Sequence, residues 1–363
     1  MKKLYLAGLL FCAVNVHAGE WITDKATKCK VWTTYDISIL SIKWTGKCKN
    51  GKANGLGTVE WFMDGKPAWT LQGIYVEGAL KLTSKGIMIW SDGSRYEGYF
   101  LDDELNGTGT MTWSDGRHYQ GDFVEGKQTG KGVLTWPNGE RYVGNFLHNN
   151  RSGRGIVTLN NGDRYEGDFL DDERHGKGIY IWSDGRRYEG DHLNFKLTGK
   201  GVMTWPSGER YEGDFVDSLQ TGHGILTLTN GDRYVGAFAS GNRTGKGSFT
   251  TSKGDHYEGD FIDGDLNGNG SIINANGNRY TGTFLDGLSH GDGVVITNLG
   301  IRIEGKFLKG KPIGKILMSS PNGASAEVTI PDDTTPGKVI VITPTGERKE
   351  IDVNGQPTIE VKP

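Results

Sequence analysis

The sequence predicts an all-β protein: an elongated, single-layer antiparallel β-meander of 23-residue hairpin repeats, with small capping segments at both ends. Ten glycines recur at a constant spacing of 23 residues, and nine of them follow a tyrosine by two positions. A fixed period of this size indicates one supersecondary unit copied along an axis. The glycines are Gly98, Gly121, Gly144, Gly167, Gly190, Gly213, Gly236, Gly259, Gly282 and Gly305.

Each repeat carries the signature of a β-hairpin. In residues 176–191, two short alternating segments flank the tripeptide Ser183-Asp184-Gly185. Asp-Gly or Asn-Gly between such segments is typical of a tight turn, because glycine adopts positive φ without steric cost. The signal recurs at Asn138-Gly139, Asn161-Gly162, Asn230-Gly231 and Asn276-Gly277.

The period-2 alternation of a strand predicts a two-faced sheet. Tyr165, Gly167 and Phe169 share one face, and charged residues occupy the other. We expect the glycine to leave a gap into which rings from adjacent strands lie. On the charged face, the Arg or His before each tyrosine predicts a solvated surface with cross-strand ion pairs, each worth under ~1 kcal/mol.

The two ends of the chain differ from the repeats. Residues 1–18 have the pattern of a secretory signal, with Lys2 and Lys3 before an apolar run and small residues before Gly19. We therefore expect an exported protein, periplasmic or secreted. Without the signal, 39 basic residues face 44 acidic ones, a formal charge of about −5. This balance disfavours nucleic acid and anionic membranes as partners.

Two cysteines remain after the signal, Cys29 and Cys48, and in an exported protein they predict a disulfide. It would tether an N-terminal cap, residues 19–43, to the repeat array of residues 44–315. After the array, residues 316–363 hold short β-type runs at 326–330, 338–343 and 349–353. We expect a small β appendage there, because an open meander needs its edge strands covered.

The repeat resembles the MORN (membrane occupation and recognition nexus) repeat. Tyr165, Gly167 and Phe169, followed by Gly176 and Gly178, carry the resemblance, which covers residues 86–315 without a gap. An earlier copy fits at residues 44–61, with tryptophan and cysteine in place of the two aromatics, and residues 62–85 are a degenerate unit. The resemblance implies an elongated twisted sheet with an aromatic groove, and scaffold, dimerisation or peptide-binding roles. It implies no catalysis, and some members have been proposed to bind phospholipid.

Departures from the pattern lie seven residues after the tyrosine, where the family has glycine. This chain has Asp103, Asn149, Asp172, Phe195 and Ser218 there. Asp and Asn tolerate left-handed backbone, whereas Phe does not readily. Because His192 also replaces the repeat phenylalanine, we expect residues 192–197 to be an irregular loop, a bend or a contact point.

The sequence offers little for catalysis or metal binding. Its histidines are scattered, and none has a recurring Ser or Cys partner. The segment 263–268 matches the start of a calcium loop, but position twelve is Asn274 rather than a bidentate glutamate. We therefore predict a protein that is not an enzyme and that has no cofactor and no metal site.

The position three residues before the turn glycine, such as Trp182 before Gly185, is tryptophan in most early repeats, leucine at 159 and 228, and Thr or Asn in the late repeats. This gradient predicts an adhesive aromatic face over residues 86–215. Three interpretations remain open: ring packing alone, a polypeptide partner or second copy, and a glycan. The candidate groove residues are Trp90, Trp113, Trp136, Trp182, Trp205, Tyr96, Tyr119, Tyr142, Tyr165, Tyr188 and Tyr211.

We therefore expect an exported repeat scaffold that binds a protein segment, or a second copy as a homodimer, through the aromatic groove. The alternative is a glycan- or peptidoglycan-binding module of the cell envelope. A phospholipid-associated protein comes third, because membrane contact and nucleic acid are both disfavoured by the charge.

Overall fold

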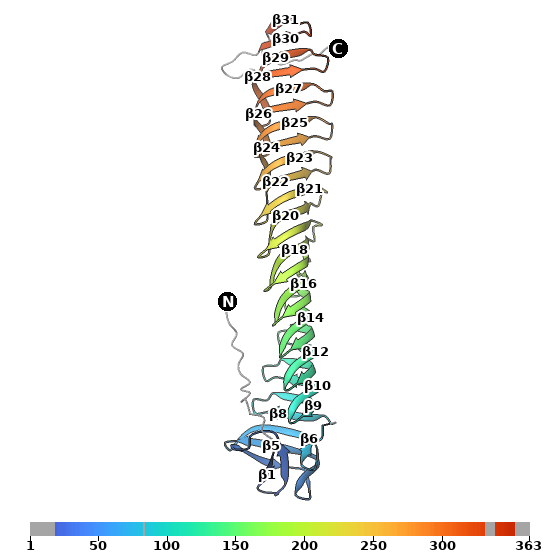
Figure 1. The fold of residues 1–363 in the computed structure, drawn as a ribbon, viewed down its shortest axis with the longest axis vertical. Helices are drawn as coiled ribbons and strands as arrows, with labels where there is room; N and C mark the ends of the chain where they lie inside the picture. Colours follow the sequence, from blue (N-terminus) through green and yellow to red (C-terminus); the bar gives the residue numbers. More distant parts are fainter. Residues whose placement is uncertain (1–18, 83, 331–337, 353–363) are drawn as a thin grey trace. The chain divides into compact units, whose positions relative to one another are not determined.

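The computed structural model of the protein describes residues 19–82, 84–330 and 338–352, so the expected signal segment 1–18 lies outside the described residues. The described residues form β-strands and no helix. By its contacts the chain divides into two compact units, Met1–Ser183 and Asp184–Pro363, and each is an antiparallel meander of hairpins (Figure 1). The predicted fold class, an all-β meander of 23-residue hairpin repeats, is confirmed in both units.

The N-terminal unit begins with a small sheet, called here the cap sheet. It contains β1 (Glu20–Thr23), β2 (Lys30–Thr33), β4 (Lys47–Lys49) and the start of β5 (Lys52–Met63). β1 pairs antiparallel with β2, and β4 with β5, while Lys30 and Lys52 join β2 and β5 in parallel. The predicted disulfide between Cys29 and Cys48 is present.

The meander of the N-terminal unit starts at β3 (Leu40–Trp44), which pairs with β5. From β5 it continues through neighbouring strands that pair antiparallel. Its remaining strands are β6 (Lys66–Val76), β7 (Ala79–Leu80), β8 (Gly86–Trp90), β9 (Arg95–Leu101), β10 (Glu104–Thr112), β11 (His118–Val124), β12 (Lys127–Thr135), β13 (Arg141–Leu147), β14 (Asn150–Thr158), β15 (Arg164–Leu170) and β16 (Glu173–Ile181).

The C-terminal unit repeats the same hairpins, and its last strands continue the meander into the segment after residue 315. Its strands are β17 (Arg187–Leu193), β18 (Lys196–Thr204), β19 (Arg210–Val216), β20 (Leu219–Thr227), β21 (Arg233–Ala239), β22 (Asn242–Thr250), β23 (His256–Ile262), β24 (Asp265–Ile273), β25 (Arg279–Leu285), β26 (Leu288–Ile296), β27 (Arg302–Leu308), β28 (Lys311–Ser319), β29 (Ser325–Ile330), β30 (Lys338–Ile342) and β31 (Arg348–Asp352).

Two kinds of turn alternate along each meander. At the tryptophan position, the backbone of Trp113 donates to Arg117 O and accepts from Gly116 N, both at 2.9 Å. The other turn has two residues with positive φ, for example Glu125 at 49° and Gly126 at 72°. This is the backbone of a type I′ turn, whose twist matches that of the flanking strands.

The core of most repeats is a tyrosine ring that lies over a pair of glycines; in the repeat of Tyr257, the Leu266 side chain covers the two glycines instead. Gly121 and Gly132 are opposite each other in the register of β11 and β12. A Cβ on either glycine would overlap the ring of Tyr119, whose hydroxyl donates to Asp122 O at 3.1 Å. Gly132 therefore accommodates a ring from the adjacent strand, as expected, whereas Gly121 accommodates a ring from its own strand. The ring belongs to the same hairpin, and it folds back over its own strand.

Phenylalanines connect one tyrosine to the next. Phe123 meets Tyr119 and Tyr96 edge-on, with ring centroids 5.1 Å apart in both pairs. The same contacts recur at Phe146 with Tyr119 and Tyr142. Edge-to-face pairs of this kind are worth about 0.5–1.5 kcal/mol beyond the area they bury. A single layer thus forms a core from rings that pack along the meander.

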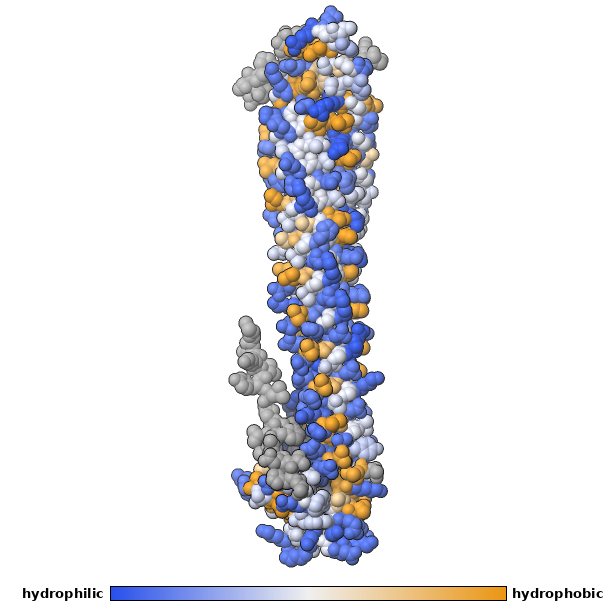
Figure 2. Space-filling model, in the orientation of Figure 1, coloured by the Kyte–Doolittle hydropathy of each residue, from blue (hydrophilic) through white to orange (hydrophobic). Residues whose placement is uncertain are grey.

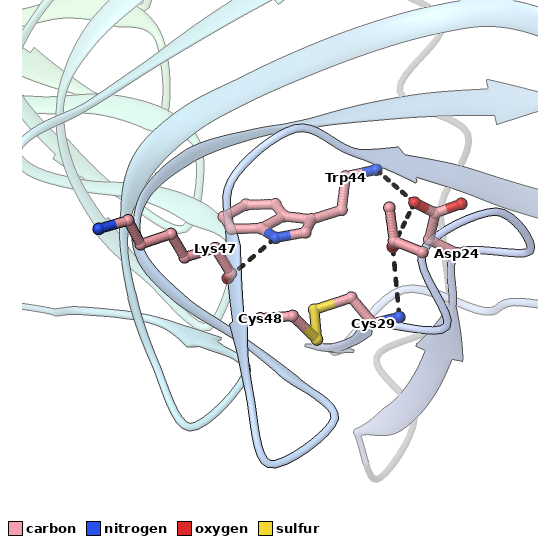
Figure 3. The surroundings of a disulfide bond; sticks show 6 residues. Asp24, Cys29, Trp44, Lys47 and Cys48 are labelled. Atoms are coloured by element: carbon pink, nitrogen blue, oxygen red, sulfur yellow. Dashed lines mark hydrogen bonds between the residues drawn. A yellow bond between two sulfur atoms is a disulfide. The ribbon is translucent and has the colours of Figure 1, made fainter.

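Substitutions at the ends of the array preserve this packing. In the early copy, the Trp44 indole covers Gly46 and Gly57 and donates to Lys47 O at 3.1 Å, as the repeat tyrosine does (Figure 3). In the last repeat, Ile303 replaces the tyrosine. Buried Ile316 stands opposite Gly305, where the second glycine would be, and covers Gly305 instead. An apolar side chain therefore still covers the glycine in the repeats that lack the tyrosine.

Candidate functional site

The six tyrosines predicted as groove residues are completely buried. Tyr96, Tyr119, Tyr142, Tyr165, Tyr188 and Tyr211 each have 0% exposure. Burial raises the pKa of Tyr142, Tyr165 and Tyr211 to about 12. A ligand has no tyrosine surface to contact in this structure, so these rings are packing elements and not the lining of an open groove.

The space that a groove would occupy is filled by side chains from the strand after each tyrosine. Gln128 and Leu197 are buried there. In the corresponding position, the Arg151 guanidinium lies over the rings of Tyr142 and Phe169, at 5.7 and 5.3 Å from their centroids. Arg151 also pairs with Asp172 at 3.1 Å. A cation over aromatic faces is favourable, and here it seals the aromatic face.

The predicted tryptophans occupy a different place from the tyrosines. In the N-terminal unit, Trp90, Trp113, Trp136 and Trp182 are half-buried and pack against the edge of the core. Trp90, Trp113 and Trp136 begin three successive turns of one kind, and Leu159 follows at the next such turn. In the C-terminal unit, Trp205 has the same backbone position and is also half-buried. Of the predicted set, only the tryptophans keep exposed surface.

We call Trp90, Trp113 and Trp136 the tryptophan row. Within the described residues, their indole N–H groups make no hydrogen bond, in contrast to that of Trp44. One face of Trp113 is covered by Arg117, whose guanidinium carbon lies 4.8 Å from the ring centroid. The row can therefore offer ring edges and N–H donors to a partner more readily than open ring faces.

The opposite face of the sheet is charged and solvated, as predicted, and Figure 2 shows hydrophilic residues on the surface of both units. The Arg–Glu pairs, however, join residues two apart on one strand, for example Arg187 and Glu189 at 2.6 Å. Lys–Asp pairs do cross strands, as between Lys200 and Asp214 at 2.6 Å. In a later repeat the acidic residue is on the first strand and the basic residue on the second: Asp292 pairs with Lys306 at 3.0 Å. Because the cross-strand ion pair is retained when its two charges change places, the pair indicates a structural role for the charged face.

The residues that replace glycine in the type I′ turns link successive turns, which the sequence analysis missed. The Asn149 side chain accepts from Gln128 N at 2.8 Å, and the Asp172 side chain accepts from Arg151 N at 2.9 Å. Asp103 has the same turn position and accepts from Thr34 N at 3.2 Å. Side-chain oxygens near turns bond to backbone readily, and this was the available signal.

Metal chemistry finds no support in the part of the chain that the structure describes. No three His, Cys, Asp or Glu side chains there come together as they would around a metal ion. The segment that resembles a calcium loop forms a type I′ turn, with positive φ at Asp263 and Gly264. The described residues also include no helix with the length and apolar character needed to cross a membrane.

Comparison with known proteins identifies one family. The model of the MORN repeat matches residues 96–116, 119–141, 142–164, 165–186, 196–210, 211–233, 234–256, 257–279 and 280–296, just over half of the chain. The gap between residues 186 and 196 contains His192 and Phe195. No curated protein matches the chain.

Three solved structures share limited similarity with the chain. The SAS-4 (dCPAP) TCP domain of Drosophila melanogaster, in complex with a proline-rich motif of Ana2 (dSTIL), is 15% identical with a TM-score of 0.30; the match covers 43% of this chain and 84% of that one. A streptogramin B lyase is 13% identical (TM-score 0.13; 74% and 82% covered). BamB from Moraxella catarrhalis is 11% identical (TM-score 0.14; 88% and 99% covered).

Proposed function

The chain belongs to the MORN repeat family, and from this premise we propose that it is an exported scaffold that binds a polypeptide segment along the tryptophan row of its N-terminal unit. MORN repeats are non-enzymatic scaffold elements, which fits a role in binding. The observation that carries the proposal is the contrast between tyrosines with 0% exposure and half-buried tryptophans at three successive turns.

The geometry of the row favours a polypeptide over a glycan. Neighbouring repeats advance by two strands, so adjacent tryptophans are roughly 10 Å apart. An extended segment could place apolar side chains against successive rings and backbone carbonyls against the indole N–H groups. Sugar rings stack on open aromatic faces, and at Trp113 one face is already occupied by Arg117. Tryptophan is also among the residues most enriched in binding hot spots.

The test compares two pairs of alanine substitutions in the same repeats. Trp113→Ala with Trp136→Ala removes the centre of the row. Val124→Ala with Leu147→Ala is the control, because these side chains are half-exposed, at 50% and 53%, at the turns of the other kind. Proteins retained by the full chain from an extract of its own cells would be compared by mass spectrometry.

We expect a specific polypeptide to be lost with the tryptophan pair and kept with the control pair. Light scattering on the same proteins identifies a second copy as the partner if only the tryptophan pair reduces the mass. Equal retention by both variants would contradict the proposal. Retention of a polysaccharide panel that depends on Trp113 and Trp136 would assign the row to glycan instead.

A further inference from the structure

The cap sheet has an outer face that is rich in lysine and tryptophan. Trp21 on β1 is opposite Trp32 on β2, and partners in register share a face. Lys30 on β2 is aligned with Lys52 on β5, which is opposite Lys49 on β4. Their neighbours Ile22, Val31 and Ala53 are buried on the inner face. The alternation therefore places the lysines and tryptophans together on the outside.

This face is locally cationic although the chain is acidic overall. Seven lysines and three acidic residues lie between Gly19 and Asn54, against a formal charge of −3 for the whole sequence. Among the three, Asp24 is buried and accepts hydrogen bonds from Ala26 N and Trp44 N. The outer face of the cap sheet, with Lys30, Lys47, Lys49 and Lys52, is therefore a basic patch on a chain whose net charge is negative.

Three lysines of this face are available to bind an anion. Lys30, Lys47 and Lys49 are exposed and form no ion pair within the residues that the structure describes. Lys52 pairs with Glu77 at 3.5 Å, and its ammonium also lies 4.9 Å from the Trp21 ring centroid. Adjacent strands are ~4.8 Å apart, so the backbones of Lys30, Lys52 and Lys49 lie side by side across three strands. The Lys52 ammonium reaches toward Trp21 on β1.

The backbone beneath the patch is held in place. The disulfide joins Cys29, next to Lys30, to Cys48, between Lys47 and Lys49 (Figure 3). The carbonyl of Lys47 accepts the Trp44 indole N–H. Trp21 lies against Gly78 and meets Trp32 edge-on, with centroids 5.2 Å apart. Side chains presented by a fixed backbone lose less freedom on binding.

We propose that this face of the cap sheet binds an acidic polysaccharide, independently of the tryptophan row. A polysaccharide with carboxylates along its length is complementary in charge to lysines that are presented from neighbouring strands. Lysine suits this ligand because it acts as a point charge, whereas planar bidentate recognition of phosphate favours arginine, which is absent from this face. An acidic peptide would gain its specificity from pockets for its side chains, whereas a charged polysaccharide can bind to a sheet surface through its charges alone.

A membrane and a single-stranded nucleic acid fit less well. Trp21 and Trp32 are 38% and 36% exposed, so little apolar surface is available to insert into a bilayer. Base stacking needs open ring faces, but Trp21 is flanked by Lys52 and by Trp32. Ring edges and indole N–H groups can still contact the hydroxyl groups of sugars.

The test measures binding of the full chain to polygalacturonate, with neutral dextran as the uncharged comparison. One triple variant carries Lys30→Gln, Lys47→Gln and Lys49→Gln. The matched control carries Lys127→Gln, Lys253→Gln and Lys309→Gln, which make the same change in net charge at exposed positions elsewhere. We expect the cap variant to bind polygalacturonate at least tenfold more weakly and with a shallower salt dependence, because three charges are lost. The control should bind within twofold of the unmodified chain.

Four results would overturn the proposal. They are no binding of polygalacturonate at low salt, equal binding of dextran, equal weakening in the control variant, and tighter binding of polyglutamate, oligothymidylate or phosphatidylserine vesicles than of polygalacturonate. Protection of the cap disulfide from mild reductant should be the same in all three proteins. This readout separates a lost charge from a disrupted cap.

Discussion

The ring of Tyr119 lies so close over Gly121 that a Cβ added to this glycine would overlap the tyrosine hydroxyl. The contact recurs in most of the other repeats, for example Tyr142 over Gly144 and Tyr211 over Gly213, but not at Gly259, where Leu266 takes the place of the tyrosine ring. It explains the 23-residue glycine spacing by sterics, because the buried tyrosine is accommodated only where its own strand has no side chain.

Gly121→Ala should destabilise the repeat in which it occurs. Adding a methyl group to a packed core costs about 1–3 kcal/mol, and in a repeat protein the cost falls on neighbouring units. Hydrogen exchange of β11 and β12 should therefore accelerate more than that of β5 and β6. Tyr119→Leu, combined with Gly121→Ala, should cost less than the sum of the single changes. Additive costs would show that the ring is not what excludes the methyl group.

Phe195→Asn should stabilise the protein. Phe195 has a φ of 65° and its side chain is 47% exposed. Left-handed backbone costs about 1 kcal/mol for an ordinary side chain, whereas asparagine tolerates it. We expect a higher melting temperature for Phe195→Asn and no change for Asn194→Asp, a residue in the same turn that already tolerates positive φ. A lower melting temperature would show that Phe195 makes contacts worth more than the strain.

Asp103 should make the attachment of the cap depend on pH. Burial raises the pKa of Asp103 from 3.8 to about 6, and the charge of Asp102 adds to the effect. A raised pKa favours the protonated folded state, so this contribution to stability is complete below about pH 4 and is lost as the pH rises through 6.

Asp103→Asn removes the ionisation but keeps an oxygen that can accept from Thr34 N. The melting temperature of Asp103→Asn minus that of the unmodified protein should therefore increase between pH 4 and pH 7. The other carboxylates are present in both proteins, so their effects on the melting temperature cancel in this difference. A difference independent of pH would mean that Asp103 titrates normally in the folded protein.

Much of the fold could be predicted because its signals are local and repeated. Asn-Gly and Asp-Gly located the turns, and the alternation around Tyr165 assigned its face correctly. Ring placement could not be predicted, since the alternation shows that Tyr119 shares a face with Gly121 but not that its side chain folds back over its own strand. That choice depends on the bulge in register after Gly121, which frees the Asp122 carbonyl to accept the hydroxyl.

The candidate site was only partly predictable for a related reason. Tyr142 and Trp136 lie on the same predicted face, yet Tyr142 is sealed by Arg151 from the next strand while Trp136 keeps exposed surface at a turn. Burial by a residue of the following strand is a tertiary property. The basic patch of the cap sheet could not be predicted from the net charge of the chain, because the excess of lysine is confined to the residues between Gly19 and Asn54.

The central claim is that a polypeptide partner contacts the tryptophan turns and not the opposite turns of the same repeats. Photocrosslinking in the protein's own cells tests this most directly, with benzoylphenylalanine placed singly at Trp113, Trp136, Val124 or Leu147. We expect a crosslinked polypeptide from positions 113 and 136 and none from positions 124 and 147. Crosslinks from positions 124 and 147 alone, or from none of the four, would contradict it.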